Sequence, residues 1–375
     1  MGILFRDCYR GKRVLVTGHT GFKGSWMTEW LLSLGAEVVG VSLADMPTEP
    51  CLFVQLGLRD RVRHHEGDIR DGEYLSGVVA AEEPDFVFHL AAQSLVRRSY
   101  EAPVETFGTN LMGTVNLLEA VRACGRPVTV VLATTDKCYE NREWDYAYRE
   151  GDPLGGYDPY SASKACAELA IGSYRKSFAE NSREVRTASA RAGNVIGGGD
   201  WAQDRIVPDC IRYLRRKEGI IVRNRHATRP WQHVLEPLGG YLWLGAELEL
   251  ERARGEGDDE RAEKVAGAFN FGPNLDANRT VAELVEEVLK SWPGEWIDQS
   301  EPGAHHEASR LNLAVDKAYH LLEWRPAWGF EKAVARTVEC YRRIEDGEAA
   351  CGVVKEQISE YYREASGKGI AWAGN

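Results

Sequence analysis

Short apolar runs separated by longer amphipathic segments recur along the first half of the chain. The apolar runs have the length of β-strands, and the segments between them show the spacing of apolar positions that is typical of helices. Strands are predicted at Arg13–Thr17, Glu37–Ser42, Arg61–His65, Phe86–Leu90, Val128–Leu132 and Val185–Arg191. Because strands that alternate with helices form parallel sheets covered on both faces, the pattern predicts an α/β fold with a doubly wound parallel sheet.

This alternation ends after the last of these strands. The glycine-rich passage Gly193 to Trp201 departs from it, which indicates a crossing into a smaller C-terminal lobe. The first domain is expected to comprise residues 1–192, and the chain is expected to return to it over about 232–275. The smaller lobe is expected to comprise 193–231 and 276–350, and residues 351–375 are expected to form a C-terminal extension. We expect the tail from Gly367 to be frayed.

The second half of the chain is predicted to be mostly helical. Helices are expected at Gln232–Leu250, Val281–Leu289, Ala314–Leu322 and Phe330–Arg343, with one more strand at Ala268–Gly272. The charged stretch from Glu251 to Glu260 is interpreted as an exposed insertion without chemistry.

The first predicted strand runs directly into a glycine turn. Gly18, Gly21 and Gly24 are spaced as G-x-x-G-x-x-G, and a helical pattern follows them. Glycines here allow a tight turn and close approach of the backbone, so the first helix can present its N-terminal N–H groups to a pyrophosphate. The order of strand, glycine turn and helix favours a dinucleotide site over an ordinary turn.

The end of the second predicted strand bears on which dinucleotide binds. An acidic residue about 20 residues after the glycines usually holds the adenosine ribose of NAD. Here the strand ends in Ser42, and Asp45 lies further on. No Arg follows directly to receive a 2′-phosphate, so the sequence favours NAD and leaves NADP open.

Tyr160 and Lys164 are four residues apart in a predicted helix and therefore share one face of it. The ammonium of Lys164 can stabilise a phenolate and lower the pKa of Tyr160 from its reference value of about 10, which makes Tyr160 a candidate base. Such pairs also occur on solvated helix faces. The segment Ala133 to Lys137 supports the catalytic reading, because it follows a strand at the edge where ligands bind in open α/β sheets.

Composition and charge limit the partners. The chain has 375 residues and a formal net charge of -11, which opposes non-specific attraction to nucleic acid or to an anionic membrane. The 8 cysteines include no Cys-x-x-Cys pair, so reduced thiols and no metal site are expected. We recognise neither a membrane span nor a signal peptide, and we expect a cytoplasmic protein.

One basic run stands out in this acidic chain. Arg223, Arg225, His226 and Arg229 fall close together. Such clustering is unfavourable unless the groups are solvated or face an anion, and a diphosphate is a natural partner. For each individual arginine a solvated loop is the alternative.

These motifs together resemble the extended short-chain dehydrogenase/reductases that act on nucleotide sugars. The glycine spacing is typical of that family, and Thr135 and the Tyr160/Lys164 pair stand in register with it. The run Thr134 to Tyr139, TTDKCY, is similar to the CDP-glucose 4,6-dehydratases, whereas the dTDP-glucose enzymes carry Thr-Asp-Glu. Further segments that resemble the same subfamily are Gly18–Trp26, Pro47–Phe53, Gly193–Trp201 and Arg229–Val234.

The resemblance implies a Rossmann-type NAD-binding domain, a nucleotide-sugar-binding lobe and a redox-neutral dehydration of CDP-glucose. Tyr160 would take the proton of the sugar 4-hydroxyl while hydride leaves carbon 4 for NAD, Lys164 would lower the Tyr pKa and hold the nicotinamide ribose, and Thr135 would hydrogen-bond the sugar oxygen. The resulting ketone acidifies carbon 5. By position Lys137 is the base there and Asp136 is the acid that releases the 6-hydroxyl, before hydride returns to carbon 6. The product, CDP-4-keto-6-deoxyglucose, implies deoxysugar and lipopolysaccharide O-antigen biosynthesis.

The resemblance also implies binding roles by position. Cofactor contacts are expected from Gly18, Thr20, Gly21, Phe22, Lys23, Gly24, Ser42, Asp68, Ile69, Leu90, Ala91, Ala92, Thr109, Tyr160 and Lys164, and substrate contacts from Ser94, Asn194, Arg205, Arg223, Arg229 and Arg310. Asp68 could instead, or in addition, cap a helix from Arg70 to Ala81. Members of the family commonly pair through the helix after Pro103 and the Tyr160 helix, so a homodimer or a dimer of dimers is expected.

Two other functions stay open. A nucleotide-sugar 4-epimerase needs Tyr160 and Lys164 but no acid and base at Asp136 and Lys137. A catalytically silent NAD-binding protein belongs to a different class, and the intact Tyr160/Lys164 pair argues against it.

Overall fold

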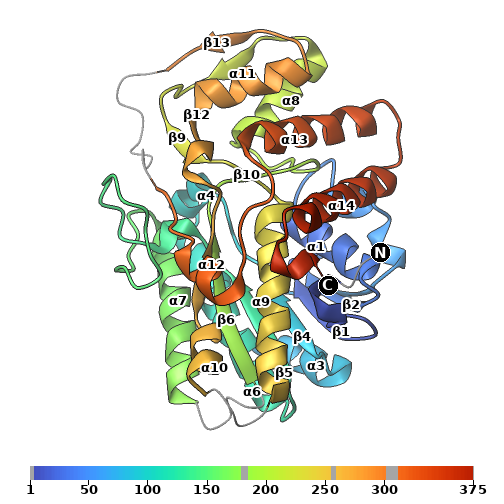
Figure 1. The fold of residues 1–375 in the computed structure, drawn as a ribbon, viewed down its shortest axis with the longest axis vertical. Helices are drawn as coiled ribbons and strands as arrows, with labels where there is room; N and C mark the ends of the chain where they lie inside the picture. Colours follow the sequence, from blue (N-terminus) through green and yellow to red (C-terminus); the bar gives the residue numbers. More distant parts are fainter. Residues whose placement is uncertain (1–3, 179–184, 255–258, 301–310, 375) are drawn as a thin grey trace.

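A seven-stranded parallel sheet forms the centre of the molecule (Figure 1). Its order is β11-β6-β5-β4-β1-β2-β3, so the sheet is extended to one side of β1 and then to the other. The strands are β1 Arg13–Thr17, β2 Glu37–Ser42, β3 Arg63–Glu66, β4 Phe86–His89, β5 Val128–Ala133, β6 Val185–Ala192 and β11 Ala268–Phe271. The predicted doubly wound parallel sheet is confirmed. The structure, a computed structural model, describes residues 4–178, 185–254, 259–300 and 311–374.

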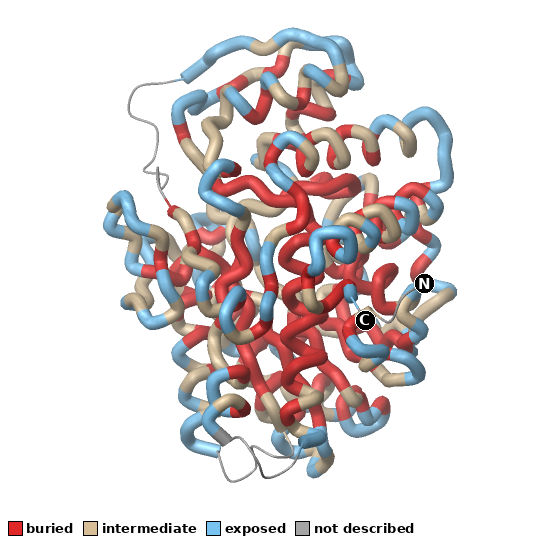
Figure 2. The backbone as a smooth tube through the Cα atoms, in the orientation of Figure 1, coloured by how far each residue is buried: buried red, intermediate tan, exposed pale blue. Residues whose placement is uncertain are grey.

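Helices cover both faces of the sheet. In β1, Val14 and Val16 pack in one apolar cluster with Trp30 of α1, whereas Leu15 packs in another with Leu117 of α6. Because successive side chains of a strand point to opposite faces, these two clusters are the two buried faces of the sheet. Figure 2 shows the sheet and α9 as the buried centre. The helices around the sheet are α1 Phe22–Ser33, α2 Leu52–Gln55, α3 Gly72–Glu82, α4 Val96–Glu101, α5 Pro103–Phe107, α6 Gly113–Ala123, α7 Pro159–Ser177, α9 Leu235–Arg254, α10 Asp259–Val265 and α12 Asp316–Leu322.

A second group of elements lies at one end of the sheet, at the top of Figure 1. It consists of α8 Ile206–Arg216, α11 Val281–Ser291 and α13 Phe330–Glu345, with the short strands β7 Val195–Ile196, β8 Ile220–Val222, β9 Thr228–Pro230, β10 Gln232–His233, β12 Asn278–Thr280 and β13 Trp296–Asp298. Trp201, Ile211, Val285 and Val338 bury one another there in a separate apolar cluster. Apart from β10, these elements fall within the ranges expected for the smaller lobe, and the division into domains stays a prediction.

Two local expectations are wrong. Asp71, and not Asp68, caps α3: its side chain accepts a hydrogen bond from the N–H of Tyr74 at 2.9 Å. The Asp68 carboxylate is already occupied by Arg70, whose Nε donates to it at 2.8 Å. The stretch after Leu250 is not simply exposed, because α9 continues to Arg254 and the Glu251 side chain in its last turn is buried. Residues 255–258 of that stretch lie outside the described residues.

The expectation of a frayed tail is also wrong. Helix α14, Ala350–Gly367, packs along α1 and α13, and the chain then returns to the core. Trp372 is fully buried and stacks on Phe5 and on Tyr361, with ring centroids 5.0 and 5.4 Å apart. The packing of these aromatic rings therefore holds the last described residues against the core.

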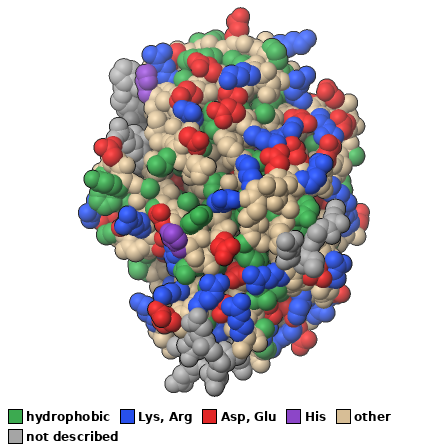
Figure 3. Space-filling model, viewed as in Figure 1, with side chains coloured by type: hydrophobic (Ala, Val, Ile, Leu, Met, Phe, Trp, Pro, Cys, Tyr) green, Lys and Arg blue, Asp and Glu red, His purple; other side chains and the backbone are tan. Residues whose placement is uncertain are grey.

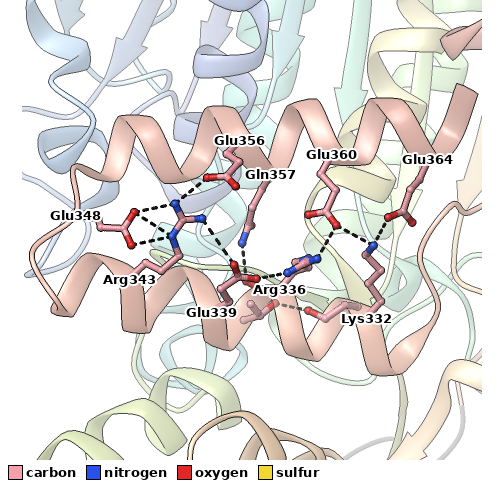
Figure 4. Close-up of polar contacts among 11 residues, drawn as sticks. Lys332, Arg336, Glu339, Arg343, Glu348, Glu356, Gln357, Glu360 and Glu364 are labelled. Carbon is pink, nitrogen blue, oxygen red and sulfur yellow. Dashed lines mark hydrogen bonds and ion pairs between the residues drawn. The ribbon is translucent and has the colours of Figure 1, made fainter.

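Ion pairs join α13 and α14 on the outside of the molecule (Figure 4). Arg336 Nη2 lies 2.6 Å from Glu360, and Arg343 Nη2 lies 2.7 Å from Glu356. In Figure 3, positive and negative side chains are interspersed over the face that is seen.

Candidate active site

The glycine turn after β1 lies against the turn after β4. Gly18 has a φ of +74°, and a Cβ added to it would lie 2.7 Å from the backbone of Ala91. A Cβ on Gly24 would overlap the carbonyl oxygen of Gly18. These two positions exclude side chains, so the turn brings its own backbone next to the turn that carries Leu90, Ala91 and Ala92.

Helix α1 begins directly after this turn. Gly21 is its N-cap, and no side chain caps the helix. The first N–H groups of a helix have no partner within it, and together with the helix dipole they favour an anion. This end of α1 therefore fits the pyrophosphate of a dinucleotide. Phe22 and Lys23 form its first turn.

Ser42 at the end of β2 is used by the turn itself. Its Oγ accepts a hydrogen bond from the N–H of Thr20 at 3.3 Å and lies 2.9 Å from Nδ1 of His19. Asp45 is exposed beyond it. No carboxylate is therefore placed at the end of β2 itself, as the sequence indicated.

The other expected cofactor contacts lie along β3 to α6. The side-chain hydrogen bonds of Arg70 hold the pKa of Asp68 below its usual range, against the opposite effect of burial, so this carboxylate is ionised at neutral pH. Ile69 is buried, and Thr109 lies in the π-helical turn Gly108–Met112 that precedes α6. A Cβ on Gly113 would strike the Ile69 side chain, so α6 approaches this strand end closely.

The segment after β5 forms a compact polar turn. Thr135 caps the 3₁₀ turn Asp136–Cys138, accepting from the N–H of Lys137 at 3.3 Å and donating to Oδ1 of Asp136 at 3.0 Å. Lys137 Nζ donates to the same oxygen at 3.2 Å. Asp136 is 1% exposed, and its Oδ2 has no hydrogen-bond partner among the described residues.

Helix α7 places Tyr160 and Lys164 beside this turn. Asp158 caps α7 by accepting from the N–H of Ser161 at 2.9 Å, so the helix starts just before Tyr160. Lys164 Nζ donates to the carbonyl of Ala133 at 3.4 Å. Both side chains are buried.

The electrostatics of the pair differ from the sequence-based expectation. Burial raises the pKa of Tyr160 to about 12, although a hydrogen bond with Thr135 acts to lower it. Burial also lowers the pKa of Lys164 to about 8. The expected depression of the Tyr160 pKa by Lys164 is therefore wrong for this structure, because desolvation of the phenolate outweighs nearby positive charge.

Two more cations belong to the same site. Burial, followed by the charges of Arg205 and Lys164, lowers the pKa of Lys23 to about 8. Arg205 Nη1 lies 2.8 Å from Asp200, and its Nη2 donates to Ser94 Oγ at 3.3 Å. The structure thus brings together Ser94 and Arg205, two expected substrate residues that are 111 residues apart in the chain.

The remaining expected substrate residues are more scattered. Arg223 is exposed and lies 3.3 Å from Asp204, and Arg229 is half-buried and donates to the carbonyl of Thr228. Asn194 has a buried side-chain oxygen without a partner in the described ranges. Arg310 lies outside the described residues. Arg223 and Arg229 of the basic run are thus solvated or bonded within the protein, as the alternative of a solvated loop allowed.

Glu168 and Arg191 form a buried ion pair behind the turn Thr135–Cys138, the proposed catalytic turn, and sequence reasoning missed this pair. Arg191 Nη2 lies 2.7 Å from Glu168 Oε2, and both side chains are less than 5% exposed. Glu168 is four residues after Lys164, and this spacing could have indicated that both share one helix face.

Helix α7 brings the buried Tyr160/Lys164 pair to the polar turn after β5. Together with the glycine turn after β1, this arrangement defines an extended short-chain dehydrogenase/reductase. The chain belongs to the GDP-mannose 4,6 dehydratase family, whose model matches residues 15–337. A CDP-glucose 4,6-dehydratase of Salmonella typhimurium is 46% identical over 362 residues, which cover 95% of this chain and 98% of that protein. The family and fold predictions are confirmed.

Solved structures show the same fold. The dTDP-glucose 4,6-dehydratase DesIV from Streptomyces venezuelae, solved with NAD bound, has a TM-score of 0.73 and 25% identity, over 89% of this chain and 98% of that one. The UDP-glucose 4-epimerase of Thermus thermophilus in complex with NAD has a TM-score of 0.69 and 27% identity, over 88% and 99%. Because both kinds of enzyme match, the fold alone does not separate a dehydratase from an epimerase.

Two further observations concern partners. Over the described ranges, no helix has the length and apolar character needed to cross a membrane. Within those same ranges, no three His, Cys, Asp or Glu side chains are grouped as metal ligands would be.

Proposed function

We propose that this protein converts CDP-glucose to CDP-4-keto-6-deoxyglucose, as a hydro-lyase that uses NAD. The observation that carries the proposal is the Asp136–Lys137 contact beside Tyr160, because dehydration needs an acid and a base that epimerisation does not. The identity to the Salmonella typhimurium enzyme supports CDP as the nucleotide. When bound, NAD takes the hydride of carbon 4 and returns it to carbon 6.

The glycine turn and α1 would hold the pyrophosphate of NAD through backbone N–H groups. Gly18, Gly21 and Gly24 leave room for it, and Leu90 to Ala92 line the neighbouring turn. Lys164 would hold the nicotinamide ribose. Ser42 offers no charge to the adenosine ribose, and the choice of NAD rests on the relatives that were solved with it.

In the oxidation step Tyr160 takes the proton of the sugar 4-hydroxyl. Since burial raises the pKa of Tyr160, the resting side chain holds its proton, and the phenolate needs stabilising in the loaded site. The Thr135 hydrogen bond, the Arg205 charge and the positive charge of the oxidised cofactor all act in this direction. Thr135 can pass its hydrogen bond to the oxygen that becomes the ketone.

The elimination step uses Asp136 and Lys137. A proton that moves from the Lys137 ammonium to the Asp136 carboxylate converts the ion pair into the neutral acid and amine that the step requires. The Lys137 amine then takes the proton of carbon 5, and Asp136 gives its proton to the 6-hydroxyl, which leaves as water. Protonation of carbon 5 by Lys137 accompanies hydride return to carbon 6 and leaves Lys137 and Asp136 together one proton short. Tyr160 holds the matching proton, which it took from the 4-hydroxyl, and proton exchange with solvent restores all three groups.

Substrate binding and assembly complete the proposal. Ser94, Asn194, Arg205, Arg223 and Arg229 line the substrate side, with the arginines toward the diphosphate, and Arg310 joins them on sequence grounds. The chain acts in the cytoplasm, in deoxysugar and O-antigen biosynthesis.

We further propose a homodimer, or a dimer of dimers, formed through α5 to α7. Exposed apolar side chains on these helices support it: Val104 is 85%, Met112 50% and Leu169 61% exposed. Burial of such residues is a main driving force for association.

The test is to offer CDP-, dTDP-, UDP- and GDP-linked hexoses with NAD and to weigh the products. CDP-glucose should lose one water without net formation of NADH. Equal turnover of dTDP-glucose, or net oxidation of the sugar, would contradict the proposal. A product of unchanged mass would indicate an epimerase.

A further inference from the structure

The buried pair Glu168–Arg191 connects three elements behind the active site. Glu168 on α7 accepts hydrogen bonds from the hydroxyls of Thr134 and Ser189, the second at 2.8 Å, in addition to Arg191 Nη2 at 2.7 Å. Both carboxylate oxygens are thus satisfied, one by Thr134 in the segment between β5 and α7 and the other by Ser189 and Arg191 of β6. A buried charge is stable only with such partners.

The contacts of this pair lie at the two ends of the catalytic turn. Thr134 directly precedes Thr135 to Cys138, and its hydroxyl is bonded to Glu168. Tyr139 directly follows the turn, and its hydroxyl accepts from Arg191 Nη1 at 2.8 Å. The Arg191 guanidinium also lies over the Tyr139 ring, 4.9 Å from its centroid. One ion pair therefore anchors both ends of the segment that carries Thr135, Asp136 and Lys137.

Tyr139 is itself also held by the edge strand of the sheet. Its hydroxyl donates to Oδ1 of Asn270 in β11 at 2.7 Å. The anchor therefore reaches from α7 through β6 to the edge strand, and a change at Glu168 is transmitted to the catalytic turn through bonds that are all buried.

The same carboxylate supplies negative charge beside Lys164. Burial lowers the pKa of Lys164 to about 8, and the charge of Glu168 is the largest influence in the opposite direction. Burial alone would raise the pKa of Glu168, but the charge of Arg191 and the hydrogen bonds from Arg191, Thr134 and Ser189 together lower it below its usual range, so Glu168 stays ionised. The other charged or titratable groups that interact with these two side chains are Lys23 of α1, His89 of β4, Cys138 of the catalytic turn and Arg175 of α7.

We propose that Glu168 is a positioning residue, which fixes the Thr135–Lys137 turn through Thr134 and Arg191 and keeps Lys164 in its charged form. It touches neither substrate nor cofactor. The catalytic consequence rests on the proposed function, because it assumes that Lys164 and the turn carry the dehydration.

The test compares Glu168→Gln with Glu29→Gln. Glu29 is a matched control, since it is fully buried and pairs with Arg61 at 2.6 Å, but on α1 away from the catalytic turn. Acetylation of Lys164 by trace acetic anhydride is followed by peptide mass over a pH series on the cofactor-free proteins. This readout needs no enzymatic activity, so it separates failure of this inference from failure of wild type to dehydrate CDP-glucose.

In Glu168→Gln the titration midpoint of Lys164 should fall by about one pH unit or more, because a close opposite charge is lost while Arg191 stays. Glu168→Asp, which retains the charge, should keep the midpoint near wild type. Glu29→Gln should lower the unfolding temperature and leave the midpoint unchanged. An unchanged midpoint in a folded Glu168→Gln would overturn the inference.

The positioning role has its own readout if Glu168→Gln does not fold. Thr134→Val removes one hydrogen bond to Glu168 and keeps the side-chain volume. It should lower kcat for CDP-glucose while KM stays near wild type, because the turn loses alignment and not binding. A wild-type kcat in this variant would overturn the positioning role.

Discussion

Lys137 Nζ lies 3.2 Å from Oδ1 of Asp136, while Oδ2 of the same carboxyl group is buried without a partner in the described part of the chain. The two side chains can therefore exchange a proton directly, and one carboxyl oxygen stays available to a ligand. In the proposed function, this relationship separates the elimination step, which would need both groups, from the oxidation step, which would need Tyr160.

The first prediction uses that separation. In Lys137→Met, oxidation at carbon 4 should survive while proton loss from carbon 5 stalls. The absorbance of enzyme-bound NADH should then build up on adding CDP-glucose, with little deuterium from heavy water entering carbon 5 of recovered sugar. If the variant binds CDP-glucose without any NADH signal, Lys137 serves oxidation or the fold. Dehydration at the normal rate would mean that another residue is the base.

Loss of the Tyr160 hydroxyl should affect rate and little else. Tyr160→Phe removes the general base, which should lower the rate by about 10²-fold or more while nucleotide binding persists. Tyr9→Phe is the control, since Tyr9 is also buried and donates to the carbonyl of Leu242 in α9. That variant should lose about 1 kcal/mol of stability and keep its rate. Near wild-type turnover in Tyr160→Phe would move the base elsewhere.

A buried carboxyl at the start of α9 should make stability depend on pH. Glu236 accepts hydrogen bonds from the N–H groups of Ala327 and Trp328 and from the Tyr361 hydroxyl, yet burial raises its pKa to about 7. The folded state therefore binds a proton that the unfolded state releases at lower pH, and stability falls as pH rises from about 4.5 to about 7.

Glu236→Gln should remove that dependence. The amide N–H of the new Gln side chain would also face the N–H groups of Ala327 and Trp328 and the Tyr361 hydroxyl, which are themselves donors. The variant should therefore lose about 1–3 kcal/mol of stability. The deficit in free energy of unfolding relative to wild type should be larger at about pH 5 than at about pH 8. Denaturant titrations at the two pH values measure it, and a deficit that grows with pH would contradict the account.

The end of the chain should stabilise the core through Trp372 and not through the ion pairs of Figure 4. Trp372→Ala should lower the free energy of unfolding by about 3–5 kcal/mol, because it removes a fully buried ring. Arg343→Ala removes partly exposed ion pairs with Glu339, Glu348 and Glu356 and should lower it by only about 1 kcal/mol. Denaturant unfolding compares the two variants, and equal losses would contradict the larger contribution of Trp372.

Sequence patterns predicted what depends on local periodicity and spacing. The strands β1, β2 and β4 were predictable because continuous apolar runs are typical of buried parallel strands. β3 is predicted to start two residues and to end one residue too early, since its sequence, Arg63 to Glu66, is polar and carries no apolar period. The cap of α3 was misplaced because Asp68 and Asp71 are equally suitable in composition, and only the Arg70 contact distinguishes them.

What failed depends on contacts between distant residues. The pKa of Tyr160 is governed by burial, which spacing from Lys164 does not reveal. Glu168 and Arg191 are 23 residues apart in the chain, and their pairing follows from the packing of α7 on β6. The fixed tail likewise results from Trp372 meeting Phe5, from the other end of the chain.

The central claim is tested most directly with CDP-glucose that carries deuterium at carbon 4. The account predicts that the product has lost one water and carries the deuterium at carbon 6, because the hydride taken from carbon 4 is returned there, with a solvent hydrogen at carbon 5. NMR and mass spectrometry of the isolated product locate the label. Deuterium that stays at carbon 4 of a sugar of unchanged mass would contradict the account and identify an epimerase.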